Sequence, residues 1–224
     1  MTKGIDISKY QPNFDWVKAK NEGCTFAIAK VGEGQSITDS CFDKHYRNAK
    51  AHGFHIGAYY MNQAKTRDGA IAEAERCIKL LQNYELDMPV WYDVEYSGTL
   101  NLGMDKVSDI IDGFCSTMEK AGYYTGVYMS ANPASRLLNK TVREKYDVWV
   151  AHYGVSKPSY NGSYGMWQYT DTNNTQDYDY AYKDYPTIIK NMKVKNNDVV
   201  KTNDDVKHKI EVYVDGVKNF ECEV

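Results

Sequence analysis

The stretch VWYDVEY, residues 90–96, combines a run of apolar and aromatic residues with two carboxylates, Asp93 and Glu95. The apolar run predicts a buried strand. A buried carboxylate without a partner is costly or takes up a proton, so core strands normally lack acids. The two acids therefore indicate either that this strand ends where water begins or that they take part in chemistry.

Seven further short runs rich in Val, Ile, Tyr and Trp, bounded by Gly, Pro, Asn and Asp, predict strands elsewhere in the chain. Between the first five strands, and again shortly after the fifth, lie segments with helical periodicity. This alternation, with near-continuous apolar strands, predicts a parallel sheet covered by helices, and eight strands suggest a closed barrel. The expected strands are residues 4–8, 25–31, 55–61, 89–95, 124–130, 147–153, 164–170 and 177–182, and the expected helices are residues 14–21, 42–51, 68–81, 104–121 and 133–138.

The last three expected strands differ from the first five. The connections over residues 154–163 and 171–176 are too short for a crossover helix, so this end should contain at least one antiparallel reversal. If the strand at 164–170 runs parallel to the first five, Asp177 lies at the mouth of the barrel. The sequence thus predicts an α/β fold, a modified TIM-like barrel with eight strands, about five helices and a helix-free end over the last three strands.

Composition limits the classes of protein to which the chain can belong. Of its 224 residues, 42% are hydrophobic and 25% are charged, which suits one large domain with a sizeable core. The formal net charge of -3 gives no sign of a nucleic-acid partner, whose phosphates call for a basic face. No stretch approaches the ~18 apolar residues of a membrane span, so we expect no membrane insertion.

The cysteines and the first residues indicate a reducing compartment. The five cysteines are odd in number and widely spread, without metal-ligand spacing, so we expect free thiols. The opening MTKGIDISKY has no apolar signal core, and we therefore expect a protein made in the cytosol. The cysteines are Cys24, Cys41, Cys77, Cys115 and Cys222.

The tail after Asn191 changes character. Residues 192–208 are polar and predict a weakly structured linker. Residues 209–224 form two alternating runs around Asp215-Gly216, the signal of a hairpin. Because a lone hairpin is marginal in water, we interpret it as the start of a second module or a means of self-association. The expected domains are a barrel over 1–191, a linker over 192–208 and a hairpin over 209–224.

Asp93 and Glu95 are spaced to act together. Residues at i and i+2 of a strand share a face, with Cα atoms about 6.6 to 6.8 Å apart. In a parallel barrel the site lies at the C-terminal ends of the strands, where Asp6 would join them. Aromatic neighbours and mutual repulsion favour one protonated and one charged carboxyl, the division that glycosidic cleavage requires. A metal site and a structural salt bridge are the alternatives.

Seven motifs, taken in order, resemble those of the family 25 glycoside hydrolases, the muramidases or lysozymes of bacteriophage endolysins and of secreted bacterial and fungal enzymes. The resemblance spans about residues 3 to 191. It implies a barrel with five helices and a helix-free end, and hydrolysis of the β-1,4 bond between N-acetylmuramic acid and N-acetylglucosamine in bacterial peptidoglycan. The motifs are GIDISKYQ (4–11), IAKVGEG (28–34), IGAYY (56–60), VWYDVE (90–95), GVYMS (126–130), VWVAHY (148–153) and MWQYT (166–170).

The resemblance also implies roles for single residues. Glu95 matches the general acid/base, Asp93 its assisting partner and Asp6 the first-strand aspartate. The last-strand aspartate usually stands in a D-x-N setting, whereas this chain reads DYD, with Asp179 in place of Asn; we assign Asp177, which opens the motif. The reaction requires no metal and no cofactor. Substrate contacts are implied for Glu33, Tyr59, Tyr128, Trp149, Tyr153, Trp167 and Gln168, for which simple packing competes evenly.

Other classes fit less well. A family 18 type chitinase also ends its fourth strand in D-x-E, but Val90 and Trp91 stand where it needs further acids. A non-catalytic peptidoglycan-binding relative would usually lack the acid at Glu95. No cysteine lies in a recognisable nucleophile setting. His52, His55 and His152 show no zinc-ligand spacing, so we interpret them as structural or surface residues.

The spacing of the two acids alone does not decide the stereochemistry, but the substrate that the resemblance implies adds a further argument. Adjacent acids on one strand suit attack by the substrate's own 2-acetamido group, which gives net retention at the anomeric carbon, better than they suit attack from the opposite face. A cell-wall hydrolase without a signal peptide fits an endolysin made in the host cytoplasm that reaches the wall after the membrane is breached. The hairpin at 209–224 would then begin a wall-binding or oligomerisation module.

Overall fold

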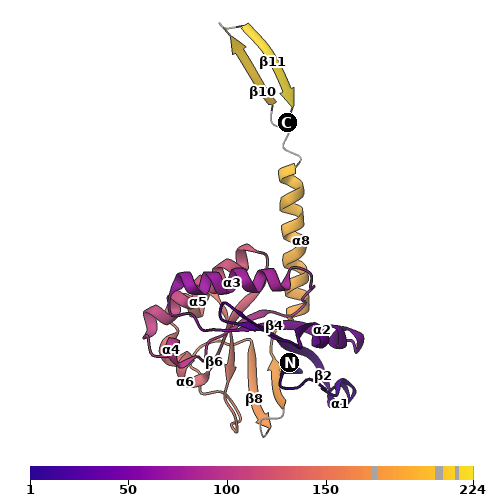
Figure 1. Cartoon of the computed structure of the whole chain (residues 1–224), viewed down its shortest axis with the longest axis vertical. Coiled ribbons are helices and arrows are strands. Elements are labelled where there is room, and N and C mark those ends of the chain that lie inside the picture. Colours follow the sequence, from indigo (N-terminus) through magenta and orange to yellow (C-terminus); the bar gives the residue numbers. More distant parts are fainter. Residues whose placement is uncertain (173–175, 205–208, 215–216, 224) are drawn as a thin grey trace. The chain divides into compact units, whose positions relative to one another are not determined.

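Eight strands close into a barrel in the computed structural model, which describes residues 1–172, 176–204, 209–214 and 217–223. Seven of them run parallel to their neighbours, in the order β1, β2, β4, β5, β6, β7, β8. The eighth, β9, closes the barrel and is antiparallel to both β8 and β1 (Figure 1). The barrel strands are β1 (Thr2–Ile7), β2 (Cys24–Glu33), β4 (His55–Met61), β5 (Val90–Asp93), β6 (Thr125–Ser130), β7 (Asp147–Ala151), β8 (Met166–Thr172) and β9 (Gln176–Ala181), and the short β3 (Ile37–Thr38) pairs with the end of β2.

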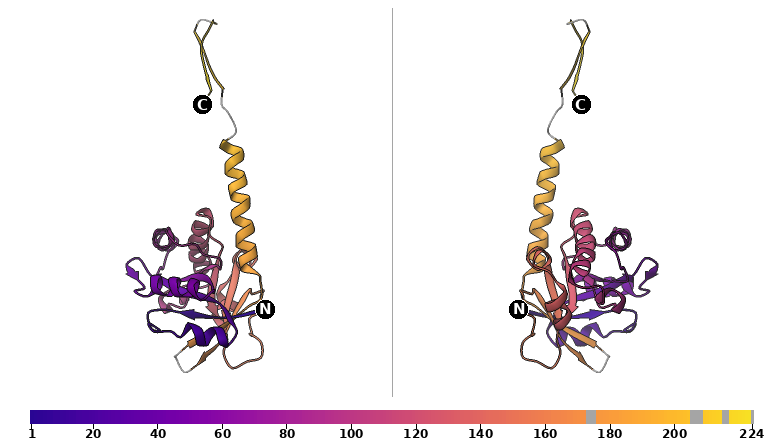
Figure 2. Two further views of the ribbon diagram at one scale, coloured as in Figure 1. Left: turned by 90° about the vertical axis from the view of Figure 1, so that its right-hand side faces the viewer. Right: turned by 90° about the vertical axis from the view of Figure 1, so that its left-hand side faces the viewer.

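The helices between β1 and β7 follow the parallel strands and cover the outside of the barrel. The two longest that do so, α3 and α5, lie side by side (Figure 1), and Figure 2 shows the purple and magenta helices grouped on one side of the strands. Among the described residues no helix occurs between β7 and β9. The helices are α1 (Trp16–Asn21), α2 (Phe42–Ala51), α3 (Arg67–Leu81), α4 (Ser97–Leu100), α5 (Met104–Lys120), α6 (Ala131–Leu137), α7 (Lys140–Lys145) and α8 (Tyr185–Asp204).

Side chains alternate between two cores along each strand. Ile5 and Ile7 of β1 point outward into the larger cluster between the strands and the helices. Trp91 of β5 and Trp149 of β7 point inward, with ring centroids 5.8 Å apart, and fill the middle of the barrel. Because the interior is packed in the middle, a ligand can enter the barrel only at its ends.

The predicted α/β barrel is confirmed, including its reversal. All eight expected strands form, β8 runs parallel to β7, and β9 is the reversed strand. Two short helices are additions to the expected five: α4 directly after β5, and α7 before β7. Segments of four and six residues are too short to show a helical period in the sequence.

Helix α8 corrects the expectation of a weakly structured segment from residue 192. It begins at Tyr185 and continues to Asp204. The Asp184 side chain caps its start by accepting from Thr187 N at 3.2 Å, and Pro186 occupies the first turn, where a proline is tolerated. No glycine or proline follows between 187 and 204, so the sequence holds no stop signal, whereas composition alone suggested a linker.

The chain comprises two compact units, Met1–Ile189 and Lys190–Val224. In the second unit β10 (Lys209–Val214) and β11 (Val217–Glu223) pair antiparallel, as the hairpin signal predicts. The turn residues Asp215 and Gly216 and the rest of the expected linker, 205–208, lie outside the described residues. The role of this unit in wall binding or self-association stays a prediction.

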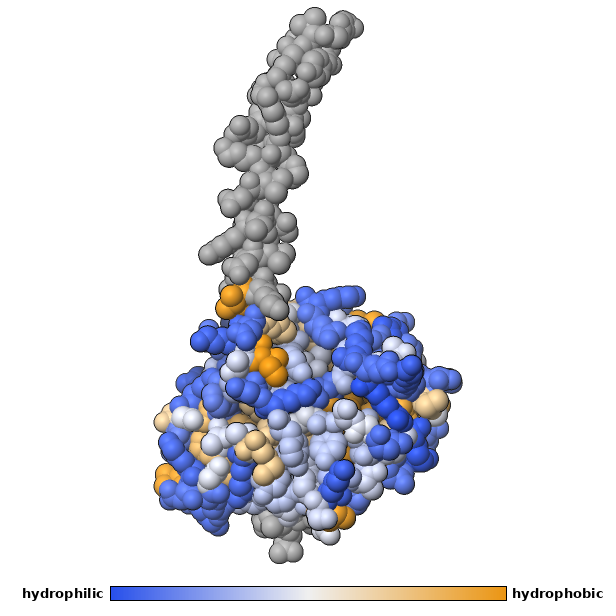
Figure 3. All heavy atoms as spheres, turned by 180° about the vertical axis from the view of Figure 1, so that it is seen from behind, coloured by the Kyte–Doolittle hydropathy of each residue, from blue (hydrophilic) through white to orange (hydrophobic). Residues whose placement is uncertain are grey.

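The face of the molecule in Figure 3 is mostly hydrophilic, with apolar residues in separate small patches. Within the described part of the chain, no helix has both the length and the apolar character needed to cross a membrane. Cys24, Cys77 and Cys115 are buried free thiols and Cys41 is a half-buried one, while the Cys222 side chain is outside the described part.

Candidate active site

A cavity of about 610 Å³ opens at the end of the barrel where the parallel strands finish. Strand ends bring together residues that are far apart in the sequence, as expected for a parallel barrel. The lining contains all four predicted acids and several of the predicted aromatic residues. It comprises Asp6, Ile7, Ser8, Tyr10, Gln11, Tyr59, Asp93, Glu95, Tyr128, Trp149, Tyr153, Gln168, Gln176 and Asp177.

Asp93 and Glu95 both reach this cavity from the end of β5. Their backbone is fixed by neighbouring strands, since Asn62 N donates to Asp93 O at 2.9 Å and Val94 N donates to Tyr128 O at 3.0 Å. Asp93 is buried, and its Oδ1 has no hydrogen-bond partner among the described residues. Glu95 lies further out, where its side chain meets solvent.

The surroundings raise the pKa of both carboxyls of this pair. Burial, followed by the charge of Glu95, raises the pKa of Asp93 well above its usual range. Loss of water around Glu95 also raises its pKa, although the charge of Lys30 opposes the shift. A carboxyl with a raised pKa can stay protonated near neutral pH and donate its proton, which is what a general acid must do.

Asp6 and Asp177 face each other across the β1–β9 pair, where they are direct register partners. Burial and the charge of Asp177 raise the pKa of Asp6 to about 8. The Asp6 Oδ2 accepts from Gln168 Nε2 at 2.8 Å, and the Asp6 carbonyl accepts from Gln176 Nε2 at 2.8 Å. These contacts fix Asp6 at the mouth beside Asp177.

Asp179 occupies a different place from Asp177. Both point inward, but Asp179 is fully buried and does not line the cavity. Its Oδ1 accepts from Trp149 Nε1 at 2.8 Å. Burial is the main cause that raises the pKa of Asp179 well above its usual range, and the charge of Asp6 adds to it. The geometry therefore favours Asp177 as the last-strand acid that meets a ligand.

Gln168 joins the aromatic side of the cavity to Asp6. Its Oε1 accepts from Tyr128 OH at 2.7 Å and from Tyr153 OH at 2.5 Å, while its Nε2 donates to Asp6. Trp149 packs against Tyr128 with ring centroids 4.6 Å apart. Five of the residues with predicted substrate contacts thus line the cavity: Tyr59, Tyr128, Trp149, Tyr153 and Gln168.

Trp167 does not line this cavity, contrary to the expectation of a substrate contact. Its ring packs against Tyr169 and Tyr180 in the outer core, and its Nε1 donates to His152 O at 2.9 Å. The reason is the alternation of β8: Gln168 points inward, so its neighbour Trp167 points outward.

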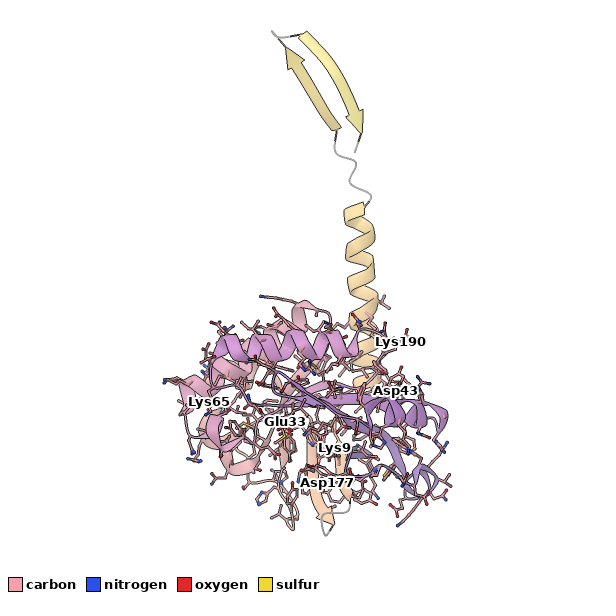
Figure 4. The ribbon with its side chains drawn as sticks, viewed as in Figure 1. Lys9, Glu33, Asp43, Lys65, Asp177 and Lys190 are labelled. Carbon is pink, nitrogen blue, oxygen red and sulfur yellow. The ribbon has the colours of Figure 1, made fainter. Side chains whose placement is uncertain are left out.

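Glu33 lies beside the cavity rather than in its lining. Its Oε2 accepts from Lys30 Nζ at 2.9 Å, and its Oε1 accepts from Gln63 Nε2. These contacts lower the pKa of Glu33, so it stays charged. In Figure 4, Glu33, Lys9 and Asp177 appear over the central part of the barrel, whereas Asp43 and Lys65 lie toward its margins.

Besides the apolar Ile7, four lining residues were not predicted from the sequence: Ser8, Tyr10, Gln11 and Gln176. The first three directly follow β1 in the GIDISKYQ motif, so their position after a barrel strand was the available signal. Ser8 N donates to Gln11 Oε1 at 3.1 Å, which shapes this turn. Among the described residues, no group of three or more His, Cys, Asp and Glu side chains is arranged to hold a metal ion.

A barrel of this type, with two carboxyls from the end of β5 and two more from the paired strands β1 and β9 in a single polar cavity, defines the class of barrel glycoside hydrolases. The chain belongs to glycosyl hydrolases family 25, whose sequence pattern it matches over residues 5–178.

Known relatives agree with this assignment. The chain is 34% identical to the autolytic lysozyme of Clostridium acetobutylicum over 170 residues, which cover 76% of the chain and 51% of that protein. It is 27% identical to lysozyme M1 of Streptomyces globisporus, over 76% of the chain and 62% of the relative. The crystal structure of the CTP1L endolysin superposes with a TM-score of 0.76 at 28% identity, covering 85% of this chain and 70% of that one. The chain thus spans about half to two thirds of the length of these two lysozymes.

Replacing Asp179 with asparagine is expected to stabilise the protein at neutral pH. An acid whose folded pKa is raised is disfavoured in its charged form, so it costs stability as the pH rises above its unfolded pKa. Asparagine can still accept from Trp149 Nε1. We expect the free energy of unfolding in urea to rise by about 1–3 kcal/mol at pH 7, with a smaller gain near pH 4. A gain of equal size at both pH values, or a loss at pH 7, would contradict this; the exposed Asp105→Asn variant should change little at either pH.

Proposed function

We propose that the chain is an N-acetylmuramidase that hydrolyses the β-1,4 bond between N-acetylmuramic acid and N-acetylglucosamine in bacterial peptidoglycan. The observation that carries the proposal is the meeting of Asp93 and Glu95 with Asp6 and Asp177 in one cavity of a family 25 barrel. Two relatives that match most of the barrel bear the name lysozyme, which supports the choice of substrate.

Glu95 is the best placed general acid. It is the outermost member of the β5 pair, so a bound sugar chain can reach it, and its raised pKa keeps a proton available. In the first step its proton passes to the glycosidic oxygen as the bond to the anomeric carbon breaks. The carboxylate left behind then takes a proton from the incoming water, which restores the acid.

Asp93 is suited to assist the substrate rather than attack it. Its Oδ1 is buried at the cavity and has no partner among the described residues, so it can accept the N–H of the 2-acetamido group. That hydrogen bond directs the acetamido carbonyl oxygen toward the anomeric carbon. The attack of this oxygen closes a new ring, and the same hydrogen bond stabilises the positive charge that develops on it. Water opens this ring from the opposite face, so two inversions give net retention.

Retention can be measured directly. Proton NMR of the reaction on a soluble peptidoglycan fragment should show the β-anomer of the new reducing end first, followed by slow mutarotation. An initial α-anomer would mean inversion and would contradict substrate assistance. A sugar ester trapped on Asp93 would leave retention standing but assign the attack to the protein.

The cavity continues beyond the four acids, which supports a polymeric substrate. A second hollow of about 510 Å³ shares Tyr10, Gln11 and Gln176 with the first. Phe14 and Tyr178 line it, and aromatic faces of this kind suit the apolar faces of sugar rings. A glycan strand that fills the first cavity therefore has a continuous surface along which to extend.

Asp177→Asn is expected to reduce turnover by about 10²-fold, because Asp177 lines the cavity and its charge raises the pKa of Asp6. Asp179→Asn, which changes a residue below the cavity, should keep more activity. Release of reducing sugar from solubilised peptidoglycan measures both. The reverse order of effects would show that Asp179 is the functional acid of the DYD segment.

The experiment that tests the function is digestion of purified bacterial cell walls alongside chitin. A muramidase clears wall suspensions and releases new reducing ends, and it leaves chitin intact. Sugar release from chitin but not from walls would favour a chitinase. Binding to walls without clearing would favour a non-catalytic relative.

The proposal extends to an endolysin role, in which the protein is made in a host cytoplasm and acts on the wall after the membrane is breached. The similarity to the CTP1L endolysin supports it. Bacteria that produce the protein should then lyse only when a membrane-permeabilising agent is added. Lysis without the agent would argue against this role.

A further inference from the structure

The cavity carries an excess of negative charge. Its described lining includes four carboxyl groups, from Asp6, Asp93, Glu95 and Asp177, and no lysine, arginine or histidine. Asp179 lies buried beneath them. Like charges this close cannot all be ionised, so the site depends on whatever positive charge lies nearby.

Lys30 supplies that charge from just behind the lining. It points to the barrel interior from β2, and only 10% of its side chain is exposed. Its Nζ lies 2.9 Å from Glu33 Oε2, 3.3 Å from Met61 Sδ and 5.9 Å from the centre of the Tyr59 ring, which lines the cavity. Met61 is the register partner of Asp93 in the β4–β5 pair, so the ammonium group lies near the end of β5 that carries Asp93.

The groups around Lys30 act on the pair in opposite directions. Asp93 at the end of β5 and Glu95 just after it lie within reach of the charge of Lys30, which lowers the pKa of both. The charge of Glu33 on β2 raises the pKa of both Asp93 and Glu95, and the charge of Asp6 on β1 raises the pKa of Asp93. The loop after β1 contributes Lys9, whose charge acts on Glu33, and β4 contributes the neutral phenol of Tyr59.

We propose that Lys30 is a positioning residue whose buried ammonium group sets the ionisation of the Asp93–Glu95 pair, keeping one carboxylate charged while the other holds its proton. The inference rests on the function proposed above and goes beyond it by assigning the pH range in which the site works to a residue outside the cavity.

A chain of hydrogen bonds holds Lys30 in place. Glu33 Oε2 accepts from the Lys30 ammonium group, and Glu33 Oε1 accepts from Gln63 Nε2. The backbone N of Gln63 donates to Glu73 Oε1 at 3.0 Å. Glu73 is buried on α3 and also accepts from Tyr92 OH at 2.6 Å. Tyr92 directly precedes Asp93 on β5. This series of hydrogen bonds thus links Lys30 on β2 to Tyr92 on β5, which explains how a flexible lysine keeps one position.

The test compares Lys30→Met with Lys30→Arg in the full chain. The profile of kcat/KM against pH on solubilised peptidoglycan should be bell-shaped for the wild type. Without the ammonium group both carboxyl pKa values rise, so both limbs of the bell should move to higher pH, by about one unit or more. Lys30→Arg keeps the charge and should keep the position of the bell. Lys140→Met, which removes an exposed lysine on α7, should leave the profile unchanged.

A lower bell at an unchanged position in Lys30→Met would overturn the inference and show that Lys30 only supports the structure. Lys30→Gln, which removes the charge but remains polar, gives the same test if Lys30→Met does not fold. A wild type that releases no sugar from cell walls would instead refute the proposed function, so the two failures are distinguishable.

Discussion

Glu95→Gln should abolish cell-wall clearing while leaving the fold intact. Glutamine keeps the size of the side chain but has no proton to give to the leaving oxygen, so we expect a loss in kcat of about 10²–10⁴-fold. Clearing of wall suspensions and release of reducing sugar measure the loss. Because the Glu95 side chain meets solvent at the cavity, the thermal unfolding midpoint should change little.

The matched control is Glu75→Gln, which makes the same chemical change on an exposed face of α3, outside the cavity. It should retain full activity. Wild-type clearing by Glu95→Gln would remove Glu95 from the reaction and leave Asp93 as the acid to test next.

Asp93→Asn is expected to have the second largest effect, a loss in kcat of about 10²–10³-fold. The carboxylate is needed to stabilise the positive charge that forms as the acetamido group attacks, and an amide oxygen lacks that charge. KM should change less than kcat, because this interaction strengthens only as the charge develops. Asp93 is buried, so circular dichroism and urea unfolding must accompany the kinetics.

Asp105→Asn, on the exposed start of α5, is the control for the same substitution away from the site. An Asp93→Asn variant that keeps its kcat but has a raised KM would assign Asp93 to binding alone. The acetamido group would then have to act without its help.

The barrel could be predicted because its strands carry two independent signals. Near-continuous apolar runs such as residues 55–61 mark the buried strands, and the short connections after residue 153 mark the end without helices. Loop length predicted at least one reversal between residues 147 and 182, and the structure has it at β9, where the register brings Asp177 opposite Asp6. Sequence spacing cannot separate Asp177 from Asp179, since both face the interior; the pairing with β1 does.

One wrong prediction and one omission at the site show where period and composition fall short. Trp167 and Gln168 are adjacent on β8, so both cannot face the interior, and motif matching alone overlooked this constraint. Lys30 has the inward parity of Phe26 and Ile28, but a lysine in a strand is usually a surface residue, and its role depends on Glu33 and Met61 folding around it. Helix α8 was not predicted from the sequence because its start signal, Asp184 with Pro186, precedes a polar segment.

Mass spectrometry of the fragments released from purified peptidoglycan tests the central claim most directly, because it identifies the bond that is cut. The site around Glu95 and Asp93 predicts fragments whose new reducing ends are all N-acetylmuramic acid, and none in the Glu95→Gln digest. Reducing ends of N-acetylglucosamine, or cleavage within the peptide stems, would contradict the claim.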